Sequence, residues 1–210
     1  MDFTNGEFYQ NIERVDTLVG AALFFESEVD DNANSSDNAA ASDILRAAVV
    51  FLHSALEEVI RNLFQHRLPY VNPENLNKIP FHDHEPSHRP KGILLGELQR
   101  YSGVYIKNII FHSINNYVDT LNINSSTHLV QCLQLAEVDH EQFVDFYPSL
   151  DSLMKRRHQI VHQMDRSNTL DPLDAPVNKI KQEMVANWRV AVTGFAEILI
   201  QTIQSNSEIS

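Results

Sequence analysis

Cysteine, glycine and proline are scarce in this chain of 210 residues, which has one Cys, six Gly and eight Pro. A single cysteine excludes an intrachain disulfide framework, and Cys132 is expected to be a buried, inert thiol. So few Gly and Pro exclude collagen-like, proline-rich and many-turned β proteins. No stretch approaches the roughly 18 apolar residues of a membrane span, and no basic region precedes an apolar run at the N-terminus. These absences predict a cytoplasmic protein without a membrane segment.

Basic residues are also few, 16 against 28 acidic ones, which gives a formal net charge of −12. Proteins that bind nucleic acids usually carry a basic surface, so this total argues against such a partner. Nine of the acids lie within residues 1–40, however, where Arg14 is the single basic residue. The rest of the chain is close to neutral, and a local basic site there stays compatible with the composition.

Apolar residues recur every three or four positions through much of the chain, the spacing that places them on one side of an α-helix. This pattern predicts helices over 8–25, 42–68, 93–101, 105–121, 127–136, 147–164 and 175–204. Polar residues 27–41 predict a loop, and five prolines within 69–91 predict an irregular excursion. Alternating runs typical of strands are absent. We expect a single all-α domain over 1–210, a bundle of about five to seven helices with its core at about 41–204, in which the second and the last helix lie side by side.

The stretch 149–165, most of which lies in the helix predicted over 147–164, carries a charge within its apolar stripe. On a wheel of about 100° per residue, six apolar residues share one side and Arg157 falls in the middle of them. The six are Leu150, Leu153, Met154, Ile160, Val161 and Met164. A guanidinium cannot lose its proton, and burying it without a partner is costly. We therefore expect either a carboxylate from a neighbouring helix, Glu57 or Glu58, or an opening toward an anionic ligand.

Two histidines and an acid fall along one shoulder of that stripe. They are His158, His162 and Asp165, so one edge of the helix presents a fixed cation, two imidazoles and a carboxylate. Arg157 and His162 are separated by about 140° in an ideal helix. Their convergence on one small group would require long side chains, a distorted helix or a second copy of the segment.

The string Arg157-His158-Gln159-Ile160-Val161-His162 resembles the signature of HEPN domains, an Arg followed after four to six residues by His. With its flanking residues and the later helix bearing Trp188, it is similar to the RiboL-PSP branch of that superfamily over about 41–204. The resemblance implies a helical bundle, and a homodimer in which two signature helices face each other across a composite active site. It also implies a metal-independent endoribonuclease that cuts RNA to a 2′,3′-cyclic phosphate and a 5′-hydroxyl. A toxin or phage-defence role follows by analogy, with an antitoxin or a larger defence system as a further partner.

Carried over to this sequence, the resemblance assigns catalytic roles to three residues. Arg157 would bind the scissile phosphate and stabilise its developing negative charge. His162 would position or deprotonate the ribose 2′-hydroxyl or protonate the leaving oxygen, and His158 would support the phosphate or orient its neighbour. The substrate-binding residues predicted around them are Lys155, Arg156, Asp165 and Arg166.

Alternatives remain at this point. Arg156 could replace Arg157 as the key arginine, with five residues before the histidine. The chain could instead be a catalytically inactive HEPN-like module that binds RNA or nucleotides or forms a dimeric scaffold. It could also be a plain helical interaction protein in which Arg157 makes only a structural ion pair.

Other histidines are weaker candidates. Residues 82–88 hold three His, an Asp and a Glu without any Cys, and we expect an exposed loop near the cleft rather than a metal site. His53 and His112 lie in apolar helical sequence and are expected to be core or edge residues. The motifs GxGxxG and GxxxxGK[ST] are absent. His84-Glu85-Pro86-Ser87-His88 has the spacing HExxH, but it lies in the excursion predicted to be irregular, whereas the zinc-binding motif lies on a helix. We therefore predict no cofactor and no metal.

Overall fold

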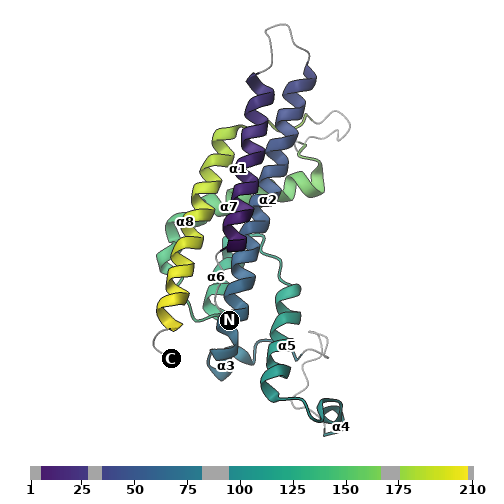
Figure 1. Ribbon diagram of the computed structural model, residues 1–210, viewed down its shortest axis with the longest axis vertical. Helices are drawn as coiled ribbons and strands as arrows, with labels where there is room; N and C mark the ends of the chain where they lie inside the picture. The colour runs from purple at the N-terminus through teal and green to yellow at the C-terminus, as the bar shows by residue number, and fades with distance from the viewer. Residues whose placement is uncertain (1–5, 28–34, 82–94, 167–175, 208–210) are drawn as a thin grey trace.

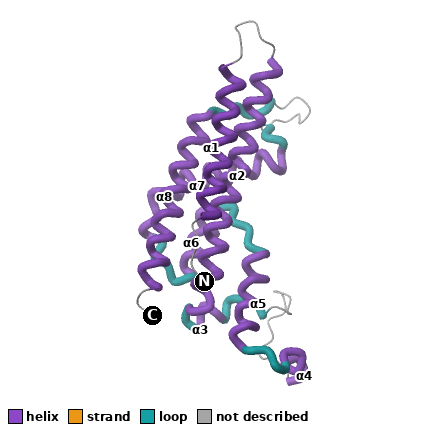
Figure 2. The backbone as a smooth tube through the Cα atoms, in the orientation of Figure 1, coloured by secondary structure: helices purple, strands orange, loops and turns teal. Residues whose placement is uncertain are grey.

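The chain forms a bundle of helices in the computed structural model, of which residues 6–27, 35–81, 95–166 and 176–207 are described. Within these ranges Figure 2 shows helices and loops but no strand, and one isolated bridge joins Arg166 to Val177. The six described α-helices of ten residues or more are α1 (Gly6–Ser27), α2 (Ser35–Arg67), α5 (Ile106–Asp119), α6 (Ser126–Leu135), α7 (Tyr147–Gln163) and α8 (Gln182–Ser207). The shorter ones are η1 (Leu68–Tyr70), α3 (Pro73–Leu76), α4 (Leu95–Leu98), η2 (Gln99–Tyr101) and η3 (Glu141–Phe146). The all-α fold class is confirmed.

Two predicted helix starts are wrong. α2 begins at Ser35, inside the segment expected to be a loop, because three consecutive alanines at 39–41 favour helix and Ala41 is buried in the core. α8 begins at Gln182 rather than near 175. Residues 176–181 before it form no helix, and the carbonyls of Asn178 and Lys179 accept hydrogen bonds from arginines. Residues 82–94, which include the histidine-rich segment, lie outside the described part of the chain.

The core lies between α1, α2 and α8, which run side by side along the long axis (Figure 1). One side of α1 is apolar, and its inward residues Phe8, Ile12, Val15 and Ala22 are buried against α2. As predicted, α2 and α8 pack against each other. At Gly194 of α8 an added Cβ would lie 2.8 Å from the ring of Phe146, so the lack of a side chain there lets η3 approach α8 closely.

α2 is more apolar than expected. The segment Ala39–Tyr70, which runs from α2 to the end of η1, is long and apolar enough, by length and composition alone, to cross a membrane, with a mean hydropathy of 1.4 in an 18-residue window. A segment of this length and hydropathy was not predicted from the apolar runs in the sequence. The central helix of a bundle shows the same pattern, since α2 contacts α1, α5, α7 and α8 and buries apolar side chains among them.

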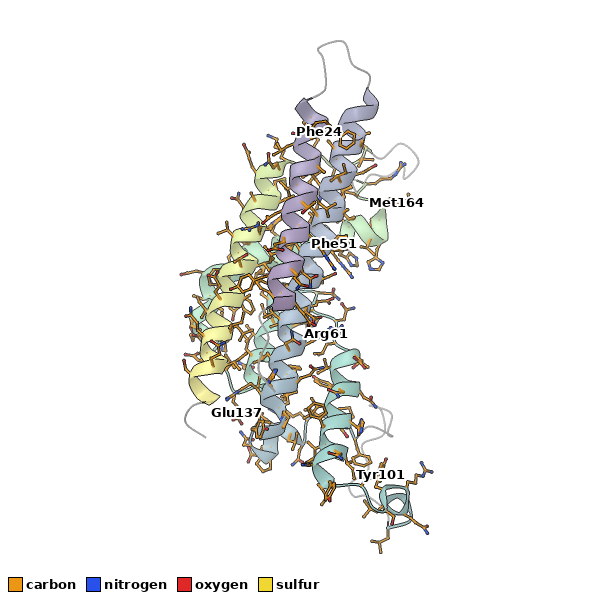
Figure 3. All side chains as sticks on the ribbon, in the orientation of Figure 1. Phe24, Phe51, Arg61, Tyr101, Glu137 and Met164 are labelled. Carbon is orange, nitrogen blue, oxygen red and sulfur yellow. The ribbon has the colours of Figure 1, made fainter. Side chains whose placement is uncertain are left out.

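The first half of α7 packs into the core, whereas its second half, residues 155–163 and hereafter the free half, is half-buried or exposed. Leu150, Leu153 and Met154 are buried, and Asp151 accepts hydrogen bonds from the backbone N–H and the hydroxyl of Ser126, at 2.6 and 2.7 Å. Figure 1 shows the other end of α7 passing α2 on the side away from α8, and Figure 3 labels Met164 there. The candidate residues between Lys155 and His162 lie on this free half, and Asp165 and Arg166 follow the helix.

Candidate active site

The apolar stripe of α7 stops being a core stripe after Arg157. Ile160 is half-buried, whereas Val161 and Met164 are 47% and 78% exposed. The expectation that these two face the core is therefore wrong. These residues do lie on one side of the helix, as the helix wheel predicts. However, α7 extends past α2, and no described element covers its last turns.

The chain reverses sharply at the end of α7. Met164 and Asp165 have φ angles of 50° and 55°, the left-handed region that costs a residue with a side chain about 1–2 kcal/mol. The backbone N–H of Asp165 donates to the carbonyl of Gln159 at 2.9 Å, which closes this helix end. Asp165 thus leaves the helix, and its predicted place on the shoulder beside the histidines is wrong.

Asp165 is instead the acid of a buried cluster with two arginines. Its Oδ2 accepts from Arg46 Nε at 2.7 Å and from Arg156 Nη2 at 2.9 Å, and its side chain is 1% exposed. Both guanidinium groups also donate to the carbonyl of Asn178, and Arg156 donates to that of Lys179. Burial lowers the pKa of Arg156, and the charge of Asp165 opposes this effect. The cluster ties α7 to α2 and to the segment before α8.

Arg156 and Asp165, both predicted to bind substrate, thus make their observed contacts with protein groups. Arg156 differs from Arg157 in that it forms an ion pair with an acid, Asp165. Of the other predicted substrate-binding residues, Lys155 is exposed on α7, and Arg166 is exposed where it pairs with Val177.

Arg157 has no such partner. Among the described residues no carboxylate lies within ion-pairing distance of it, so neither Glu57 nor Glu58 plays the expected part. Its Nε is buried without a hydrogen bond, although the side chain as a whole is only half-buried. A desolvated, unpaired donor on a permanent cation is costly, and an arriving anion would relieve that cost.

His53 of α2 is the neighbour that the sequence reading missed. It is buried, its Nε2 lies 3.0 Å from the carbonyl of Ile123, and its Nδ1 has no hydrogen bond. Glu57 Oε2 is 3.9 Å from that Nδ1. Burial is the main cause that lowers the pKa of His53, and the positive charge of Arg157 lowers it further, against the raising effects of Glu57 and the Ile123 carbonyl. His53 thus resists protonation, and Arg157 is close enough for its charge to act on the imidazole.

This burial predicts a pH-dependent stability. The unfolded chain protonates His53 below its ordinary pKa of about 6.5, whereas the folded chain resists protonation, so stability is lost as pH falls through that value toward the lowered folded pKa. Urea unfolding at about pH 7.5 and about pH 5 should show a smaller pH effect in His53→Leu than in wild type, whatever the overall stability of the variant. Equal pH effects in both proteins would contradict the burial of a neutral His53.

His158 and His162 form an exposed pair on the same half of α7. Their ring centroids lie 4.7 Å apart with an interplanar angle of 45°, as expected for residues four apart on a helix. The end of α7 thus combines a partly desolvated guanidinium with two accessible imidazoles. A guanidinium can bind and stabilise an anion, and an imidazole can accept or donate a proton near neutral pH.

Two other residues considered in the sequence analysis lie away from the end of α7. Cys132 is buried on α6, and burial raises the pKa of its thiol to about 12, so it is protonated and inert as expected. His112 lies on α5 and is exposed, so it is an edge rather than a core residue.

Comparison with known proteins identifies one family. The family model described as RiboL-PSP-HEPN matches residues 22–205, which include α2, α5, α6, α7 and nearly all of α8. No curated protein and no solved structure matches the chain significantly.

Proposed function

Because the chain belongs to the RiboL-PSP-HEPN family, which indicates an RNase-like or nucleotide-binding function, we propose that it is a metal-independent endoribonuclease. The single observation that carries this proposal is that the free half of α7 bears two exposed imidazoles and an arginine that has no acid partner among the described residues. Arg157 and His162 occupy the two ends of the Arg-x4-His spacing within the matched region.

In the proposed reaction the ribose 2′-hydroxyl attacks the adjacent phosphorus. A basic imidazole removes the 2′-hydroxyl proton as the O–P bond forms, and the bond from phosphorus to the 5′-oxygen breaks. The imidazolium formed in this way, or a water molecule, supplies the proton that the 5′-oxygen needs, which leaves a 2′,3′-cyclic phosphate and a 5′-hydroxyl. Arg157 stabilises the negative charge that develops on the phosphate oxygens. We assign His162 to proton transfer and His158 to supporting the phosphate or orienting His162.

We further propose that two copies of the chain complete the site. Val161 and Met164 leave apolar surface beside the histidines that no described residue covers. Arg157 and His162 lie on different sides of one helix, separated by about 140°, so the arginine of one subunit and the histidine of the other can share a cleft. The toxin or defence role and any antitoxin belong to this proposal as well and rest on family analogy.

The test is the cleavage of total cellular RNA in excess EDTA at low salt, where weak binding by an acidic protein is least limiting. Wild type should produce fragments that end in a cyclic phosphate, and His162→Ala should lose about 10²–10⁴-fold in rate. His128→Ala is the matched control, since His128 is exposed on α6, outside the free half of α7, and should cut like wild type. RNA that is bound by wild type and never cut would favour the inactive binding module instead.

A further inference from the structure

The two imidazoles at the end of α7 lie close enough together to bind the same metal ion. Two histidines four apart on a helix lie on one face, and here both are exposed with ring centroids 4.7 Å apart. With metal–nitrogen bonds of about 2.0–2.1 Å, two imidazoles at adjacent positions of one ion have centroids about 4.5–5.2 Å apart. The observed separation falls in that range without any rearrangement of the helix.

We propose that His158 and His162 chelate a divalent transition-metal ion of the Zn²⁺ and Ni²⁺ class, and that this ion inhibits the nuclease. Imidazole nitrogen is a preferred donor for these ions, whereas Mg²⁺ and Ca²⁺ require oxygen ligands. The inhibitory part rests on the proposed function, because a bound ion occupies the nitrogen lone pairs that proton transfer uses.

Within the described part of the chain, no further protein ligand is available to this ion, so water would complete its coordination. Among the described residues no third His, Cys, Asp or Glu joins the pair, and the nearest acid in sequence, Asp165, is buried between two arginines. Lys155 and Arg157 add positive charge nearby, which weakens cation binding. The site is therefore a two-ligand, reversible one, suited to regulation rather than to a permanently held ion.

The first experiment is calorimetric titration with NiCl₂ of the full chain carrying His82→Ala, His84→Ala and His88→Ala, which removes the histidine-rich segment as a competing ligand. One ion should bind per chain. Adding His158→Ala or His162→Ala should weaken binding at least about tenfold, since the loss of an outer-shell group alone costs 10–100-fold, and adding His128→Ala should change nothing. Equal binding with and without His158 would overturn the proposal.

A second measurement uses NMR on the same triple variant. Substoichiometric Cu²⁺ should broaden the ring signals of His158 and His162 together, and signals of other histidines broadened first would overturn the proposal. In an EDTA-free assay, RNA cleavage should fall in step with Ni²⁺ occupancy. If Ni²⁺ binds the pair but RNA is never cut in EDTA, the nuclease proposal fails and the metal site stands. If RNA is cut and Ni²⁺ does not bind, the metal proposal alone fails.

Discussion

Replacing Asp165 with alanine is expected to lower the unfolding free energy by about 3–5 kcal/mol, the cost typical of removing one partner from a buried ion pair. Arg46 and Arg156 would remain in the interior with their positive charges uncompensated. They are also close enough for each charge to act on the other. Urea denaturation followed by circular dichroism measures the loss, which should appear as a lower midpoint with an unchanged slope.

Asp16→Ala is the matched control for this prediction. Asp16 on α1 binds Arg189 on α8 through two hydrogen bonds of 2.5 and 2.6 Å, but the two side chains are 47% and 36% exposed. Water screens such a pair, and its loss should cost no more than about 1 kcal/mol. Similar losses for Asp165→Ala and Asp16→Ala would show that burial does not set the strength of the Asp165 cluster.

Arg157→Leu is expected to separate activity from stability. The variant should lose about 10²–10³ in kcat/KM, the usual cost of removing one group that stabilises a developing oxyanion. Its unfolding free energy should be unchanged or higher, because the Nε that disappears is buried without a hydrogen bond. Arg156→Leu is the matched comparison and should be clearly destabilised, since it breaks the pair with Asp165. An Arg157→Leu protein that unfolds easily would identify Arg157 as a structural residue.

Mixing variants extends this test to the dimer. Arg157→Leu and His162→Ala each lack one half of the proposed composite site. Subunit exchange between them creates dimers with one intact site, so random reassortment should restore about one quarter of the wild-type sites. Mixtures that stay inactive although the subunits exchange would contradict a site shared between two copies.

Local patterns of the sequence predicted most of the helices and the placement of Arg157 partly within the core. They did not predict where along α7 the apolar side becomes exposed. Periodicity indicates which side of a helix is apolar, but it does not indicate how far a neighbouring element covers that side. Val161 and Met164 continue the stripe in sequence and face outward in the fold.

The fate of Asp165 could not be predicted from its own helix. Met164 and Asp165 adopt left-handed conformations although neither is Gly or Asn, so no residue signalled the reversal. The acid partner of Arg156 depends on that reversal, and Arg46 joins from 119 positions away. The sequence predicted His53 as a core or edge residue, and only the fold shows that the charge of Arg157 acts on its imidazole.

The N-terminal helix has a consequence for anyone who shortens this chain. The family match begins at residue 22, near the end of α1, so a trimmed version drawn at that boundary would discard Phe8, Ile12 and Val15. The apolar surface of α2 that these residues cover would then be exposed to water, and exposed apolar surfaces of this kind promote aggregation. Aggregation of such a truncated protein would result from the loss of α1 and would give no information about the oligomeric state of the intact chain.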